Sequence, residues 1–107
     1  MTRIRVFRGA SGGLRGFSVA GHTGAGGAGN DIVCAGVSAL AQTAVNALEA
    51  IAGVRARVII APGLLVLRLP EGIPPRRRRD AQIILRTALQ GFTDIAAAYP
   101  LNVRITE

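Results

Sequence analysis

The chain has 107 residues, enough for one domain with a single core, and its net charge of +7 arises from thirteen arginines and no lysine. One cysteine excludes an internal disulfide, and together with one histidine it excludes a conventional zinc cage within the chain. We therefore expect no cofactor, and chemistry that is metal-free or that borrows a ligand from a partner. No signal-peptide pattern opens the sequence, so a cytoplasmic location is expected, where a free thiol stays reduced.

The first thirty residues predict a β-hairpin and then a loop. Ile4 and Val6 alternate with Arg3, Arg5 and Phe7 in a strand over residues 2–8, and a second strand covers residues 14–20. Residues 21–30 form the expected loop, whose four glycines are Gly24, Gly26, Gly27 and Gly29. Because glycine lets a backbone move or approach a ligand closely, we expect this flexible loop to shape access for a substrate.

A long helix is predicted over residues 31–52, where apolar side chains recur every three or four positions. Asn30 or Asp31 is its expected N-cap, and Gly53 its expected C-terminal glycine. Polar residues interrupt the apolar run well short of about twenty apolar positions in a row, so we expect no membrane span.

The second half predicts a hairpin, a helix and a last strand. The hairpin strands cover residues 54–61 and 64–69, the helix residues 76–99 and the last strand residues 101–106. The order strand, strand, helix, strand, strand, helix, strand indicates an α+β fold. We expect one domain over residues 1–107, with a mostly antiparallel sheet of about five strands and two helices packed on one face.

His22 and Cys34 lie at the two ends of the glycine-rich loop. A lone cysteine is usually a small buried apolar residue, and a lone histidine an ordinary polar one. If Asn30 or Asp31 caps the helix, however, Cys34 falls in the first turn, where unpaired N–H groups and the helix dipole favour the reactive thiolate. A cysteine and a histidine so placed fit a nucleophile and its base. The same N–H groups are candidates to stabilise an oxyanion.

The pattern of these residues resembles the ribosomal-processing cysteine proteases, the Prp family. It consists of Gly21-His22, Asp31-Ile32-Val33-Cys34-Ala35 and Val37-Ser38-Ala39-Leu40. The resemblance implies a bacterial endopeptidase that removes a short N-terminal extension from large-subunit ribosomal protein number twenty-seven. It also implies a catalytic dyad carried by His22 and Cys34, a homodimer, and a Prp-like protease domain spanning residues 1–107.

The motif implies two supporting residues, and the chain departs from the motif in two places. Asp31 is expected either to cap the helix or to orient His22. Ser38 follows Cys34 by one helical turn, where its hydroxyl could reach the sulfur or the histidine. The chain differs from the usual family pattern in the small residues between His22 and Asp31, and in Gly36, where alanine is more usual. The reaction expected of the dyad is acyl transfer through a thioester.

Two other classes of function remain open. The basic cluster Arg76, Arg77, Arg78 and Arg79 and the overall charge fit a non-catalytic RNA- or ribosome-associated module, or a protease that works near RNA. The four aromatic residues, Phe7, Phe17, Phe92 and Tyr99, are expected mainly in the core, which leaves no base-stacking platform. A phosphate site at the glycine loop is the third possibility, although the loop lacks the lysine of a P-loop.

Overall fold

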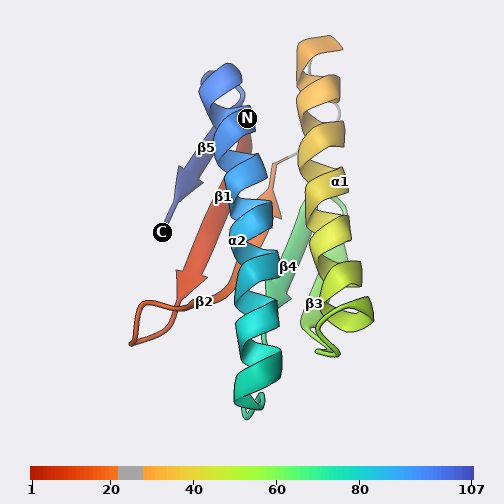
Figure 1. Ribbon diagram of the computed structural model, residues 1–107. Helices are drawn as coiled ribbons and strands as arrows, with labels where there is room; N and C mark the ends of the chain where they lie inside the picture. The colour runs from red at the N-terminus through yellow and green to blue at the C-terminus, as the bar shows by residue number, and fades with distance from the viewer. Residues whose placement is uncertain (22–27) are drawn as a thin grey trace.

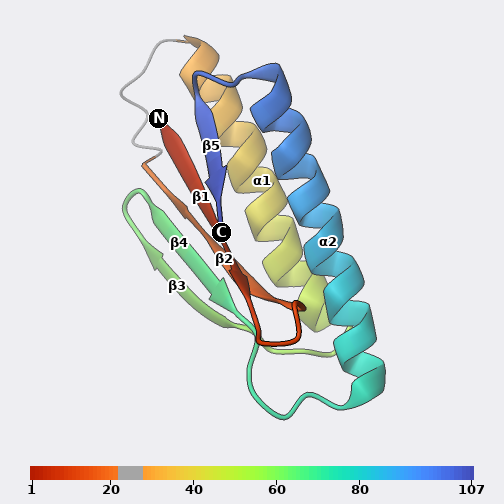
Figure 2. The same cartoon turned by 90° about the vertical axis from the view of Figure 1, so that its left-hand side faces the viewer.

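Two helices lie side by side on one face of a five-stranded sheet, and no described helix lies on the other face (Figure 1 and Figure 2). The computed structural model describes residues 1–21 and 28–107 of the chain, and the side chains of residues 1–21 and 32–107. The predicted order of elements and the α+β class are confirmed.

The sheet has the strand order β3-β4-β2-β1-β5. The strands are β1 (Thr2–Arg8), β2 (Leu14–Ala20), β3 (Arg57–Ala61), β4 (Leu64–Arg68) and β5 (Val103–Thr106). All neighbours pair antiparallel except β1 and β5, which are parallel, so the sheet is mixed. β3 and β5 start three and two residues later than predicted, because residues 54–56 and 101–102 form connections.

Helix α1 (Ala28–Ala50) starts three residues earlier than predicted. Asn30 and Asp31 therefore lie inside its first turn, and their prediction as N-cap residues is wrong. Gly29 also belongs to the helix and not to the loop. No proline interrupts residues 28–31 and Ala28 is a strong helix former, so nothing in the sequence stops the helix at Asp31.

Local sequence explains where α1 ends and where the second helix begins. Gly53, just beyond α1, has φ +67°, which confirms its place at the C-terminal turn, and the N–H of Val54 donates to the carbonyl of Leu48 at 2.8 Å. Helix α2 (Pro75–Ala98) begins with Pro75, whose ring presets the helical φ and whose missing N–H would be unpaired there anyway.

The core lies between the sheet and the two helices. Its largest fully buried side chains are Phe92, Ile4, Leu48, Leu67, Leu85, Val19 and Val37. The rings of Phe17 and Phe92 meet edge to face at 5.1 Å, which confirms both as core aromatics. The same prediction is wrong for Phe7, which is half-buried on the outer face of β1, and for Tyr99, which is 42% exposed.

One segment of α1, Ile32–Ala50, is long and apolar enough to span a membrane by length and composition, with mean hydropathy 1.3. The fold accounts for this apolar content in another way. Val33, Val37, Ala41, Ala44 and Leu48 are all buried against the sheet and α2, at a spacing of three or four residues. The apolar face of this helix is thus part of the core.

Candidate active site

The thiol of Cys34 lies where α1 passes the first residue of β1. Its sulfur is 3.6 Å from the hydroxyl oxygen of Thr2, and either atom can be the donor. Cys34 is half-buried and forms no disulfide. Thr2 is 2% exposed and is fixed by the sheet, because its N–H donates to the carbonyl of Asn102 at 2.8 Å. The sheet therefore supplies a fixed polar partner for the thiol.

Thr2 is the residue that sequence analysis missed. Among the residues whose side chains are described, it is the buried polar one, and it shares the inward face of β1 with Ile4 and Val6. The alternation of β1 already places position 2 on that face. The pattern predicts an apolar side chain at this position, and a threonine there could have indicated a buried polar contact, since a buried hydroxyl needs a hydrogen-bond partner.

The early start of α1 changes the expected electrostatics of Cys34. Counted from Ala28, Cys34 belongs to the second turn of the helix and not to the first. Only N–H groups at the very start of a helix lack intrahelical partners, so in a helix that begins at Ala28 the N–H of Cys34 is not among the expected oxyanion donors. The prediction that placed Cys34 in the first turn is wrong by one turn.

Several predicted site residues lie outside the described part of the chain. These are His22, Gly24, Gly26 and Gly27, while Asp31 is described only as part of the backbone of α1. Gly21, which precedes His22, is described. It has φ +87°, and a Cβ placed on it would come within 2.5 Å of the carbonyl oxygen of Met1. The backbone thus enters the loop beside the start of β1, at the end of the sheet where Thr2 meets Cys34.

Ser38 lies one turn after Cys34 in α1 and is half-buried. The hydrogen-bond partner of the Cys34 sulfur among the described side chains is Thr2, and no hydrogen bond joins Ser38 to that sulfur there. The structure thus places Ser38 on the expected helix without bringing its hydroxyl to the thiol.

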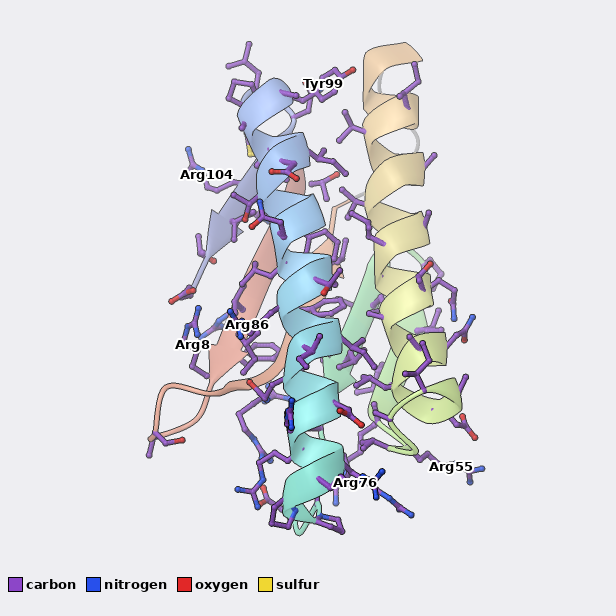
Figure 3. All side chains as sticks on the ribbon, in the orientation of Figure 1. Arg8, Arg55, Arg76, Arg86, Tyr99 and Arg104 are labelled. Carbon is purple, nitrogen blue, oxygen red and sulfur yellow. The ribbon has the colours of Figure 1, made fainter. Side chains whose placement is uncertain are left out.

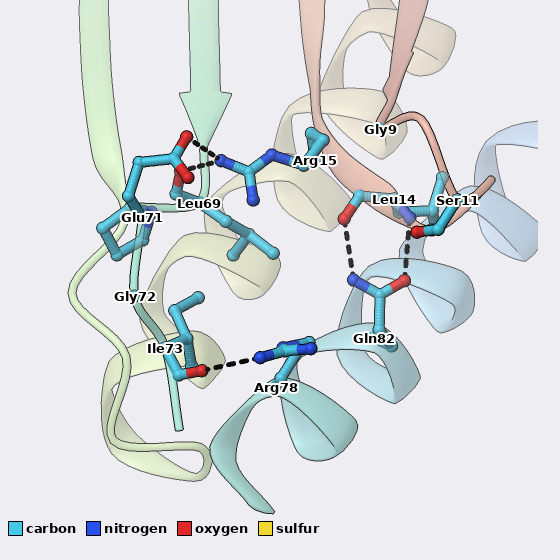
Figure 4. Close-up of a pocket in the computed structure, with 12 residues that line it drawn as sticks. Gly9, Ser11, Leu14, Arg15, Leu69, Glu71, Gly72, Ile73, Arg78 and Gln82 are labelled. Carbon is cyan, nitrogen blue, oxygen red and sulfur yellow. Dashed lines mark hydrogen bonds and ion pairs between the residues drawn. The ribbon is translucent and has the colours of Figure 1, made fainter. Parts of the chain in front are cut away.

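A hollow of about 330 Å³ lies between the β1–β2 turn, the β4–α2 connection and α2 (Figure 4). Its polar groups bind one another. Arg15 pairs with Glu71 at 2.8 Å, and the amide of Gln82 accepts from the N–H of Leu14 at 2.8 Å and donates to its carbonyl at 2.7 Å. Cys34 does not line this hollow. The hydrogen bonds of Arg15 and Gln82 hold α2 and the β4–α2 connection against the sheet.

The cluster Arg76 to Arg79 is exposed at the start of α2, at the end of the helix opposite Tyr99 (Figure 3). Arg77 donates to the carbonyl of Gly53 at 3.4 Å, and Arg78 to that of Ile73 at 3.2 Å. These bonds explain in part how four cations are tolerated at a positive helix end, since two of them reach carbonyl oxygens of neighbouring connections.

Comparison with known proteins assigns the chain to a family. The family model described as cysteine protease Prp matches residues 1–104. A Bacillus subtilis (strain 168) protein named ribosomal processing cysteine protease Prp is 31% identical over 108 residues, which cover 99% of this chain and 96% of that protein.

Solved structures agree with that assignment. Staphylococcus aureus Prp in complex with a substrate peptide superposes with a TM-score of 0.89 at 26% identity over 100% of both chains. SMU.848 from Streptococcus mutans gives a TM-score of 0.87 at 30% identity and covers 100% of this chain and 96% of that one. The chain therefore belongs to the Prp family of cysteine proteases.

Proposed function

We propose that this protease removes the N-terminal extension of large-subunit ribosomal protein number twenty-seven, with Cys34 as nucleophile and His22 as general acid and base. The observation that carries the proposal is the half-buried thiol of Cys34 held by Thr2, in a chain of this family. Two relatives support the substrate class, since one is named a ribosomal processing protease and the structure of another contains a substrate peptide.

The proposed reaction has two steps. In the first, the thiolate of Cys34 attacks the scissile carbonyl carbon, a C–S bond forms, and His22 protonates the amine as the C–N bond breaks. In the second, His22 takes a proton from water, the water oxygen attacks the thioester, and the C–S bond breaks. The hydroxyl of Thr2 can donate to the sulfur whenever it carries negative charge, which keeps the nucleophile in one orientation.

Asp31 and Ser38 are proposed as supporting residues of the same reaction. Because Asp31 lies inside α1, we propose that it orients His22 instead of capping the helix. Replacing Asp31 with Asn tests this role: peptidase activity should fall while helix content and melting temperature stay unchanged. A drop in melting temperature that matches the loss of activity would leave only a structural role.

We also propose that the protein is a cytoplasmic homodimer that works near ribosomal RNA. The edge strand β3 supports the dimer, because no described strand pairs with its outer backbone groups and Ile59 and Ile60 are 61% and 66% exposed on its opposite faces. Sedimentation should show a dimer that Ile60→Arg converts to monomer. The matched variant Ile83→Arg, at a 50% exposed position of α2, should leave it a dimer.

The experiment that tests the peptidase is incubation with the ribosomal protein carrying its native N-terminal extension, followed by intact mass. We expect one truncated product with the wild type and none with Cys34→Ala. An unchanged mass with a rapidly alkylated Cys34 would indicate a thiol enzyme with another substrate. An unchanged mass with an inert thiol would favour the alternative function, a basic RNA- or ribosome-associated module without catalysis.

A further inference from the structure

The uncovered face of the sheet carries five arginines. In the register of the sheet, Arg3 is opposite Arg104 and Arg57 opposite Arg68, while Arg5 follows Arg3 on the same face of β1. All five are exposed. Both helices pack on the other face, so no described helix or strand covers these side chains (Figure 2). We call this surface the arginine face.

The described strands that form the arginine face contribute no acidic side chain to balance it. None of the five strands contains Asp or Glu, and the described ion pairs involve Arg8, Arg15 and Arg55 but no arginine of this face. A second copy of the chain would bring five positive charges against five more, which is unfavourable. The surface instead attracts a polyanion.

An open hollow of about 530 Å³ lies at one end of this face. It is lined by Arg5, Val6, Phe7, Arg8, Arg68 and Glu107. The guanidinium of Arg68 stacks over the ring of Phe7 at 4.0 Å, and that of Arg5 lies 5.9 Å from the same ring. The single carboxylate here, that of Glu107, is paired with Arg8 at 2.9 Å. Arg5 and Arg68 are thus available to an anion, and Phe7 fixes the plane of Arg68.

We propose that the arginine face binds a segment of single-stranded RNA. Guanidinium groups match phosphate oxygens in a two-pronged geometry, and a planar Arg68 on Phe7 offers a surface on which a base can stack. An acidic protein segment would use the charges but not this stacked plane, so the hollow favours a nucleic acid. One end of the face lies at the end of the sheet where Thr2 contacts Cys34 on the opposite face, since Arg3 follows Thr2 in β1.

RNA binding by the arginine face rests on the proposal that the protein works near ribosomal RNA, but it does not require peptidase activity. The two can therefore fail separately. The probe is a fluorescent oligouridine of about twelve nucleotides, within the range of site sizes for single-strand binders. Fluorescence anisotropy with the full-length protein at increasing salt gives both the affinity and its salt dependence.

Two triple variants with equal loss of charge locate the site. Arg3→Gln, Arg5→Gln and Arg68→Gln together should weaken binding by about tenfold or more at low salt and reduce the salt slope by about two, at ~0.7 per phosphate contact for single strands. The control, Arg76→Gln, Arg79→Gln and Arg86→Gln, changes three exposed arginines of α2, the helix that packs on the other face of the sheet. It should weaken binding less than about threefold.

A Phe7→Leu variant tests the stacked plane with no change in charge. Its binding should fall about fivefold, because stacking and the orientation of Arg68 are both lost. Equal weakening by the two triple variants, or stronger weakening by the control, would overturn the proposal, as would failure of the wild type to bind at low salt. Competition by oligoglutamate as effective as that by unlabelled oligouridine would assign the face to acidic proteins and overturn the RNA assignment.

Discussion

The hydroxyl oxygen of Thr2 lies 3.6 Å from the sulfur of Cys34, across a separation of 32 residues in the chain. Thr2 pairs with Val103 of β5, and β1 also pairs with β2 from Arg3 onward, so the sheet holds Thr2 in place. The orientation of the proposed nucleophile is therefore set by the sheet.

Removing the Thr2 hydroxyl should slow the reaction of the Cys34 thiol. Thr2→Val keeps the shape of the side chain and should reduce the rate of alkylation by iodoacetamide about three- to tenfold, because a hydrogen bond to a charged group contributes about 1.5–3 kcal/mol when fully formed. Thr2→Ser keeps the hydroxyl and should stay within about twofold of wild type. The rates are read by intact mass at fixed pH, with thermal melting as the fold control.

The order of the two variants separates a chemical from a packing role. If Thr2 matters only as a buried β-branched side chain, Thr2→Val should label as fast as wild type and Thr2→Ser should be the impaired one. That order of rates would remove Thr2 from the active site.

The sequence predicted the elements well, because period-two alternation in the strands and three-to-four spacing in the helices reflect one buried side each. It predicted the start of α1 poorly. Asn30 and Asp31 suit an N-cap and are also tolerated in a first turn, so local preference alone could not place the boundary. The position of Cys34 relative to unpaired N–H groups changed with that boundary.

Phe7 and Thr2 show why a pattern must be followed where it conflicts with residue type. The alternation of β1 placed Phe7 with Arg3 and Arg5 on the outer side, yet its aromatic character suggested the core. The same alternation placed Thr2 inside, among apolar residues. No sequence pattern predicts the pairing of β1 with β5, because this pairing joins the two ends of the chain. It places Arg104 beside Arg3 in the arginine face and holds Thr2 in position.

Gly36→Ala should stabilise the protein. This variant introduces the alanine that is more usual at this position of the motif. A Cβ at position 36 would lie 3.4 Å from Cδ1 of Ile95, a contact that a flexible side chain can accommodate. Alanine in a helix is favoured over glycine by about 0.5–1 kcal/mol, so the melting temperature should rise by a few degrees.

The contrasting variant is Gly16→Ala. Gly16 has φ +150°, and its Cβ would lie 1.9 Å from the carbonyl oxygen of Leu67 on the neighbouring strand, so this change should lower the melting temperature strongly. A lower melting temperature for Gly36→Ala would mean that the packing of α1 against α2 has no room for a methyl group at this point.

Gln82→Glu should destabilise the contact between α2 and β2. The amide of Gln82 both accepts from the N–H and donates to the carbonyl of Leu14, and a carboxylate can only accept. Loss of the donor leaves the Leu14 carbonyl facing a negative charge, which should cost about 1–3 kcal/mol in urea unfolding. Gln42→Glu, exposed on α1, is the matched control and should change stability by less than about 0.5 kcal/mol. Equal effects of the two variants would contradict this role for Gln82.

The carboxylate of Glu107 closes the C-terminal end of the sheet onto β1. It accepts from Nε of Arg8 at 3.1 Å and from Nη2 at 2.9 Å. These hydrogen bonds, with a smaller contribution from the charge of Arg8, lower the pKa of Glu107 below its ordinary value, and desolvation opposes them. A lowered pKa in the folded state means stabilisation that is present above the ordinary carboxyl pKa and is lost as the pH falls through the lowered one.

An NMR titration of the Glu107 side-chain carboxyl carbon measures this directly. Arg8→Gln should raise its pKa toward the ordinary value, and added salt should move the wild type in the same direction, because the pair is exposed and screened. The effect on thermal stability should be small and confined to acid pH. If wild type and Arg8→Gln titrate together, the two side chains do not pair in solution, and the end of β5 is then held by its parallel pairing with β1 alone.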